Sequence, residues 1–265
     1  MQFTPYEQSR PLPPYQAILA VDAAGFTSRP GSSHDHVAQL IPTLVGEVVS
    51  AAGMADEWAS RGFFGHTGDG FAAGLPTRCL PYLIHPFPDL LQQRLDRLRR
   101  ETGDALRLRV AVHVGPLPTE VGAYGVSGNG DARNDTHRLL DCDAVKDALA
   151  RNSARVTLVA LVISDRVFHD VVDAGYAGLH IDHFRAVTAT VAGKSFQQPA
   201  WVYVPAPSGG GGDAPALAGD AVRPDGAPAA TPARARASVQ TNHGQVIDRM
   251  SGTMHIGRIG AGGPA

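Results

Sequence analysis

Two aspartates, each next to a glycine-containing break in the chain, are the residues best suited to chemistry. Asp22 ends an apolar run and precedes Gly25, and Asp69 lies within Gly68-Asp69-Gly70. A carboxylate at the end of a buried strand needs a cation or hydrogen bonds to offset its desolvation. Mg²⁺ is usually held by one or two carboxylates together with substrate phosphates. The pair therefore fits a metal cradle, while a strand-end cap and a plain Asp-Gly hairpin turn remain the structural alternatives.

Polar groups that could bind a nucleotide occur at three other places. Phe26 and Thr27 follow Gly25 at an expected helix start, where free backbone N–H groups suit a phosphate. Asn134 and Arg138 are four residues apart on an expected helix and share one face. They suit a ribose and a phosphate, or form an ordinary surface pair. Lys194, in a Gly-Lys turn, is either solvated or within reach of a phosphate.

The elements that would position these residues follow from hydrophobic periodicity. Continuous or alternating apolar runs predict strands at 17–21, 106–116, 156–163, 184–191 and 198–204, and a hairpin at 63–75. Helical spacing predicts helices at 36–52, 80–100, 131–141, 144–150 and 164–172. Pro42 is expected to kink the first helix or delay its start, and the second is expected to begin after Pro88. Its leucines form the apolar face, so Gln92 and Gln93 are expected in solvent.

Composition limits the class of protein. The 265 residues suffice for one large domain or for one domain with tails, and 43% hydrophobic and 18% charged residues suit a globular core. A net charge of −2 argues against a broad nucleic-acid footprint. Cys79 and Cys142 match no metal spacing and are expected to be buried thiols. We find no signal peptide and no run of about twenty apolar residues, so we expect a cytoplasmic protein without a membrane span.

The chain divides into four expected segments. Residues 1–14 are a polar, proline-rich arm, and 15–205 hold all the periodic elements. Residues 206–237 are rich in Gly, Ala and Pro, which predicts a disordered linker. Residues 238–260 regain scattered Val, Ile and Met among small polar residues, with almost no net charge and no proline, which are traits of a β-stacking segment.

Four short motifs, in order, resemble those of the class III nucleotidyl cyclase catalytic domain. The Asp-x-x-Gly-Phe-Thr motif is matched at 22–27 and Gly-Asp-Gly at 68–70. The strand motif Arg-x-x-x-His-x-Gly-Pro is matched at 109–116, and Asn-x-x-x-Arg-Leu at 134–139. The resemblance covers 15–205 and extends to an actinobacterial cyclase-like group with the wording His-Arg-Leu-Leu-Asp. It implies an α+β, ferredoxin-like domain with a mostly antiparallel central sheet flanked by helices.

The resemblance also implies an activity and a set of roles. The activity is conversion of a nucleoside triphosphate to a 3′,5′-cyclic nucleotide and pyrophosphate. Asp22, Asp69 and the Ala23 carbonyl would hold two Mg²⁺ or Mn²⁺ ions, and Gly25, Phe26, Thr27 and Lys194 would bind phosphates. Asn134 would orient the ribose and Arg138 would stabilise charge on the α-phosphate. A homodimer is implied, with the metals and the Asn/Arg pair supplied by different subunits.

The base-reading positions depart from the family pattern. They align with Gly65, beside His66, and with a position near Ser127, so neither purine code is present. Three interpretations stay open: ATP or GTP read by other contacts, a pyrimidine nucleotide as in antiphage pyrimidine cyclases, or weak nucleotide binding with signalling by association.

The C-terminal segment resembles a second family. Two half-repeats, 242–247 and 251–257, are similar to bacterial amyloid signalling motifs of the RHIM type. A cyclase-like domain tethered to such a motif implies a role in signalling or in antiphage immune defence, with an amyloid-motif-bearing partner. The rival hypothesis is an inactive cyclase-homology domain that senses or scaffolds and signals through its tail.

Overall fold

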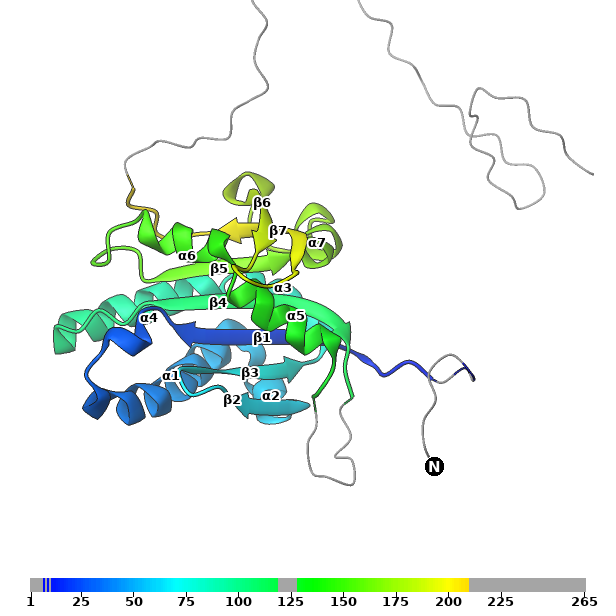
Figure 1. The fold of residues 1–265 in the computed structure, drawn as a ribbon, viewed down its shortest axis with the longest axis horizontal. Coiled ribbons are helices and arrows are strands. Elements are labelled where there is room, and N and C mark those ends of the chain that lie inside the picture. Colours follow the sequence, from blue (N-terminus) through cyan, green and yellow to red (C-terminus); the bar gives the residue numbers. More distant parts are fainter. Residues whose placement is uncertain (1–6, 8, 10, 119–127, 210–265) are drawn as a thin grey trace, which may run out of the picture. The chain divides into compact units, whose positions relative to one another are not determined.

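The fold is described from a computed structural model that covers residues 7, 9, 11–118 and 128–209. Its centre is a seven-stranded sheet with the order β2-β3-β1-β4-β5-β7-β6 (Figure 1). The β4–β5 pair is parallel and every other pair is antiparallel. The strands are β1 (Tyr15–Ala23), β2 (Phe63–His66), β3 (Gly70–Leu75), β4 (Leu108–Pro116), β5 (Val159–Ser164), β6 (Arg185–Thr190) and β7 (Gln197–Tyr203). Every predicted strand is present, and the hairpin is formed by β2 and β3.

Strand β1 lies in the middle of the sheet, between β3 and β4. Its residues from Ala17 to Ala23 are all buried, which explains why the sequence there is apolar without alternation. Leu19 and Val21 face one core cluster, and Ile18 and Ala20 face the other. By the same alternation, the side chain of Asp22 lies on the face of Ile18 and Ala20.

The first face of the sheet packs against most of the helices. These helices are α1 (His34–Val49), α3 (Leu80–Ile84), α4 (Phe87–Thr102) and α7 (Asp165–Val167), while α2 (Ala55–Ala59) follows α1 after a glycine break. Helix α1 starts at His34 and runs through Pro42, so the proline does not delay it. Apolar residues on both sides of Pro42, such as Ile41 and Leu44, are anchored in the core, which offsets the one lost backbone hydrogen bond.

By length and composition, the helical stretch Gly31–Ala59 could cross a membrane, although the sequence contains no uninterrupted run of twenty apolar residues. This is weak support for a span, because the core helix of a globular domain passes the same test. In this fold the apolar face of α1, including Val37, Val45 and Val49, packs in the main core cluster.

Two expectations for α4 are wrong. The helix begins at Phe87, so Pro88 lies in its first turn, where a missing N–H has no effect on the helix. Gln92 is buried and does not lie in solvent. Its amide accepts hydrogen bonds from the backbone N–H groups of Leu158 and Val159, at 2.8 and 3.1 Å, and donates one to the Val156 carbonyl, at 2.8 Å. A glutamine side chain thus holds the start of β5 against α4.

The second face of the sheet is covered by α5 (Asp131–Leu140) and α6 (Asp143–Ala150), which lie toward the viewer in Figure 1. Leu139, Leu140 and Val145 pack onto Ile18, Ala20 and the alternate residues of β4 and β5. Both cysteines are free and buried, as predicted. Asp22 therefore points to this second face of the sheet. Asn134 and Arg138 lie on the exposed surface of α5, which covers that face.

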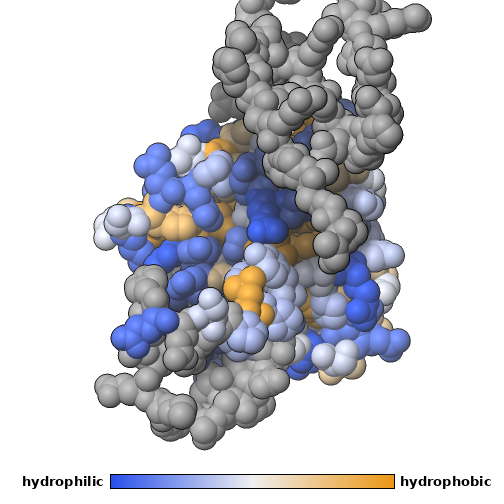
Figure 2. All heavy atoms as spheres, turned by 90° about the vertical axis from the view of Figure 1, so that its right-hand side faces the viewer, coloured by the Kyte–Doolittle hydropathy of each residue, from blue (hydrophilic) through white to orange (hydrophobic). Residues whose placement is uncertain are grey.

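The described surface has few large exposed apolar side chains, and the face in Figure 2 is mainly hydrophilic with small separate apolar patches. Residues 206–209, at the start of the predicted linker, make hydrogen bonds to the domain. The backbone N–H groups of Ser208 and Gly209 donate to Asn152 Oδ1, at 2.6 and 2.7 Å. The rest of the predicted linker, the amyloid-like segment and Ser127 lie outside the described residues.

Candidate functional site

The centre of the candidate site is a row of three residues on neighbouring strands of the sheet. Asp22 on β1 lies opposite Gly70 on β3 and opposite Arg109 on β4. The Asp22 carboxylate accepts two hydrogen bonds from Arg109, from Nε at 2.8 Å and from Nη2 at 2.6 Å. Both side chains are about one-tenth exposed. This bidentate pair provides the cation that a buried strand-end carboxylate requires.

Asp69 lies close to Asp22. The β2–β3 turn folds back on β1, because the Asp69 carbonyl accepts a hydrogen bond of 3.0 Å from the Ala23 N–H. Gly68 has a φ of +93°, which the turn needs. A Cβ at Gly70 would lie 1.9 Å from the Val21 carbonyl oxygen. Gly68 is therefore needed for the conformation of the turn, and Gly70 for the close packing of β3 against β1.

The electrostatics around Asp22 favour additional positive charge. Burial raises the pKa of Asp22 to about 6, Arg109 opposes that rise, and the nearby carboxylates of Asp69 and Asp141 add to it. A carboxyl group with such a pKa is ionised at neutral pH, but its negative charge is incompletely compensated. The described residues contain no cluster of three acidic, His or Cys side chains that could hold a metal on its own. Asp22 and Asp69 together would supply two carboxylates, which is the usual protein share of a Mg²⁺ site with a phosphorylated ligand.

The loop after β1, which was expected to bind phosphate at a helix start, is a short turn. Gly25 has a φ of +71° and is followed by a 3-10 turn at Phe26–Ser28 in place of the longer helix start that we expected. Gly25 and Thr27 are exposed, and the Phe26 ring stacks on His34 at 4.3 Å. The Gly25 carbonyl accepts from the Ser28 N–H, at 3.1 Å. The turn thereby holds the backbone next to Asp22 in one conformation.

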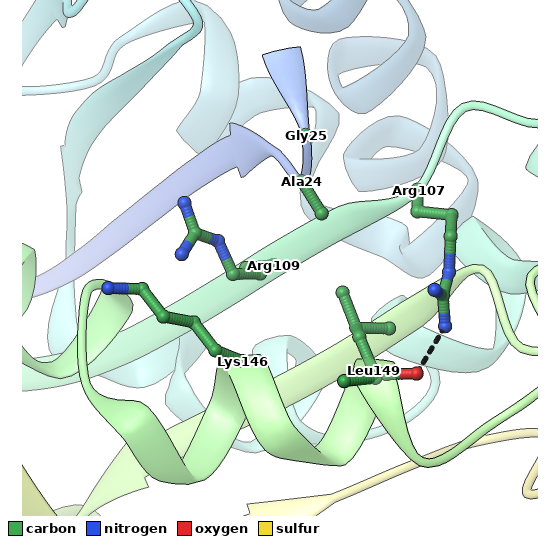
Figure 3. Close-up of a pocket in the computed structure, with 7 residues that line it drawn as sticks. Ala24, Gly25, Arg107, Arg109, Lys146 and Leu149 are labelled. Carbon is green, nitrogen blue, oxygen red and sulfur yellow. Dashed lines mark hydrogen bonds between the residues drawn. The ribbon is translucent and has the colours of Figure 1, made fainter. Parts of the chain in front are cut away.

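A basic pocket of about 320 Å³ adjoins this loop. It is lined by Ala24, Gly25, Arg107, Arg109, Lys146, Leu149 and Ala150 (Figure 3). Arg107 is fixed, because it donates to the carbonyls of Thr157 and Leu149, at 3.0 and 2.6 Å. Figure 3 shows the Lys146 side chain extending from α6 toward the Arg109 guanidinium. The pocket therefore places cationic groups beside the end of β1.

Asp141 links two lysines to the same region. Its carboxylate contacts Lys146 Nζ at 2.5 Å and Lys194 Nζ at 3.6 Å. Burial acts to raise the pKa of Asp141, but hydrogen bonding to Lys146 and the charges of Lys146, Lys194 and Arg109 leave it below its usual value. Lys194 itself lies in a turn with Gly193 at a φ of +74°, and its side chain is exposed. The predicted phosphate-binding lysine is thus held near the site by an acid that the sequence analysis did not single out.

Asn134 and Arg138 lie on the exposed face of α5, as their spacing predicts. Arg138 Nη1 contacts Asp135 Oδ1 at 2.8 Å, and its guanidinium lies 5.7 Å from the centre of the Phe196 ring. Within the described residues of one chain, neither residue is hydrogen-bonded to Asp22 or Asp69. The structure therefore brings the two aspartates together but leaves the Asn/Arg pair facing outward.

The expected base-reading positions Gly65 and His66 lie on β2. His66 is exposed, and its ring meets the edge of Phe64 at 4.9 Å. Gly65 is in close contact with Arg133 of α5, since a Cβ built at Gly65 would lie 2.6 Å from Arg133 Nη2. Sequence reasoning missed Arg133, and it also missed the ion-pair roles of Arg109, Asp141 and Lys146. Arg109 lies in the matched motif at 109–116 and Asp141 ends the His-Arg-Leu-Leu-Asp wording, so a signal existed for both, whereas Arg133 and Lys146 needed the tertiary structure.

Comparison with known structures identifies the fold class of the domain. No protein-family model and no curated protein matches the chain. A bacterial light-regulated adenylyl cyclase superposes with a TM-score of 0.50 at 15% identity, over 77% of this chain and 55% of that one. The domain has the fold of a class III nucleotidyl cyclase catalytic domain. This confirms the predicted fold class, and the match spans just over half of the light-regulated enzyme.

Two further cyclase structures are similar at lower scores. The guanylyl cyclase Cya2 has a TM-score of 0.46 at 15% identity, over 72% of this chain and 91% of that one. The adenylyl cyclase CyaB from P. aeruginosa has a TM-score of 0.45 at 12% identity, over 72% and 93%. At 12–15% identity, the activity of this chain has to be argued from its own residues.

Proposed function

We propose that this chain is a metal-dependent nucleotidyl cyclase that converts a nucleoside triphosphate to a 3′,5′-cyclic nucleotide and pyrophosphate. The observation that carries the proposal is the position of Asp22 beside Asp69 in a cyclase fold. The two carboxylates and the Ala23 carbonyl would form an all-oxygen donor set, which Mg²⁺ and Mn²⁺ accept. When bound, two such ions would activate the ribose 3′-hydroxyl and stabilise charge on the triphosphate.

The remaining residues of the site would bind and orient the substrate. The turn from Gly25 to Thr27 would receive phosphate oxygens, and Lys194 would bind the terminal phosphates as a point charge. Asn134 would hold the ribose so that its 3′-oxygen lies in line with the α-phosphate. Arg138 would stabilise the negative charge that develops there.

A homodimer is part of this proposal. The Asn134 and Arg138 side chains face outward on α5, while the aspartates lie at the end of β1. A twofold dimer would bring the pair of one subunit to the aspartates of the other and form two equivalent sites. The outward orientation of Arg138, whose described contacts are Asp135 and Phe196, supports such an arrangement.

A nucleotide panel tests the activity. The full chain is incubated with Mn²⁺ or Mg²⁺ and each of the four nucleoside triphosphates, and the products are separated by chromatography. We expect a cyclic nucleotide and an equimolar amount of pyrophosphate from at least one of them. Asp69→Ala should abolish product formation while its thermal midpoint stays near that of the wild type. A dimeric protein that yields no cyclic product from any triphosphate would refute the proposal.

A second candidate function is signalling without catalysis. It is favoured by Gly65, because this expected base-reading position has no side chain to contact a base. In that hypothesis the cyclase-like domain senses or scaffolds without turnover, and residues 238–260 assemble with an amyloid-motif-bearing partner in signalling or antiphage defence. A peptide of residues 238–260 should then form thioflavin-positive fibres, and a peptide with both half-repeats scrambled should not. A wild-type peptide that stays monomeric at high concentration would remove the support for assembly through the tail.

A further inference from the structure

Arg133 occupies the space above the residue that lacks a side chain. Gly65 lies on β2, and a Cβ built there would be 2.6 Å from Arg133 Nη2 and 3.4 Å from its Cζ. Any side chain at residue 65 would have to displace this guanidinium. The polar group at this point of the surface is therefore supplied by α5, one residue before Asn134.

The guanidinium is held in place from two sides. Its Nη1 donates to Asn129 Oδ1 at 3.3 Å, and its Cζ lies 5.4 Å from the centre of the buried Phe63 ring. Phe63 is itself confined, because a Cβ at Gly128 would lie 2.4 Å from its Cγ. A cation over an aromatic face is stabilised electrostatically, which favours one position of the arginine.

Arg133 Nη2 is the guanidinium atom nearest to Gly65, and among the described residues neither Nη2 nor Nε donates a hydrogen bond to the protein. Among the described residues, Asn129 is the hydrogen-bond partner of Arg133, and no carboxylate lies within ion-pair distance of it. A guanidinium has five N–H donors in a planar fork and no acceptor. Nε and Nη2 are thus two parallel donors that a planar ligand with two adjacent acceptors would satisfy.

We propose that Arg133 reads the nucleotide base in place of a side chain at residue 65 and selects guanine or cytosine. This rests on the proposed nucleotide site. Guanine presents the adjacent acceptors O6 and N7, the common bidentate partner of arginine. Cytosine presents the adjacent acceptors O2 and N3. Adenine and uracil alternate acceptors with donors along their edges, so a guanidinium fork meets one acceptor and one opposing N–H.

Binding of 3′-deoxynucleoside triphosphates tests the proposal without turnover, because they lack the 3′-hydroxyl needed for cyclisation. With Mn²⁺ and the full chain, 3′-deoxyGTP or 3′-deoxyCTP should bind roughly 10- to 100-fold more tightly than the adenine and uracil analogues. Arg133→Leu should remove that difference, and Arg133→Lys should keep only part of it. Arg97→Leu, which changes an exposed arginine on α4, is the control and should retain the full selectivity.

The outcomes separate this inference from the proposed activity. Selective binding that depends on Arg133, without any cyclic product from any of the four triphosphates, refutes the activity and supports the base reading. Product formation with a selectivity that Arg133→Leu does not change refutes the base reading alone. A preference for the adenine or uracil analogue also overturns it. Thermal midpoints of all variants exclude loss of folding, and Arg133→Gln replaces the leucine variant if that one is unstable.

Discussion

Asp22 and Arg109 face each other across β1 and β4, and the guanidinium binds both carboxylate oxygens, at 2.8 and 2.6 Å. Asp22 also lies directly opposite Gly70 on β3, so the turn that bears Asp69 packs against the same row. A residue proposed to bind metal is therefore already paired with a cation from a neighbouring strand, which compensates its charge only in part. A metal ion in the cradle would share the Asp22 carboxylate with Arg109, and the site would depend on both.

Arg109→Gln should destabilise the domain. The change leaves a buried carboxylate without its cation, and loss of one partner of a buried pair costs about 3–5 kcal/mol. Urea unfolding followed by far-UV circular dichroism measures the effect. Arg166→Gln removes an arginine from an exposed pair with Asp170 and should change the midpoint little. Equal effects of the two substitutions would show that the Asp22–Arg109 pair contributes no more than a surface contact.

Gly70→Ala should destabilise more than Gly68→Ala. A methyl group at residue 70 would overlap the Val21 carbonyl oxygen and crowd the Asp22 Cα, at 1.9 and 2.7 Å. The strands must separate to accept it, which costs at least about 1–3 kcal/mol. Gly68 has open space around it, so alanine there meets only the strain of positive φ, about 1–2 kcal/mol. Thermal unfolding of both variants gives the comparison, and a smaller loss for Gly70→Ala contradicts the packing argument.

Gln92→Leu should reduce stability by about 2–5 kcal/mol, because the backbone N–H groups of Leu158 and Val159 lose their acceptor in the interior. Gln93 is exposed on the next position of the same helix, so Gln93→Leu is the matched control and should have little effect. Amide hydrogen exchange offers a second readout, since the start of β5 should exchange faster only in the Gln92 variant.

Buried thiols predict slow reaction with thiol reagents. Burial raises the pKa of Cys79 to about 11, and it also raises the pKa of Cys142. The reactive thiolate is therefore scarce at pH 8, and both sulfurs are shielded. The native protein should react slowly with a chromogenic disulfide reagent at pH 8, and addition of urea should release two fast equivalents. Rapid labelling of the native protein would place a cysteine at the surface.

The sequence predicted the elements of this fold well because its strongest signals are local. Asp22 at the end of an apolar run and the Gly-Asp-Gly turn identified β1 and the β2–β3 hairpin. Gln92 was assigned to solvent because its partners at and just before the start of β5 are more than 60 residues away, and no periodicity reports them. Arg133 was missed for the same reason, since its relation to Gly65 arises only when α5 packs near β2. Local pattern thus predicts which residues form an element, and tertiary contacts decide what a polar residue does there.

Mixing two inactive variants should restore activity if the sites lie between subunits. Asp69→Ala removes a carboxylate from the cradle, and Arg138→Ala removes the outward-facing arginine of α5. Random reassembly makes half of the dimers mixed, and each mixed dimer has one intact site, so about a quarter of wild-type activity should return. Cyclic nucleotide formation after co-refolding measures this. Mixing Asp69→Ala with Asp22→Ala is the control and should stay inactive, because both changes affect the same half of the site. If the first mixture also stays inactive while the dimers exchange subunits, each site is built within one chain.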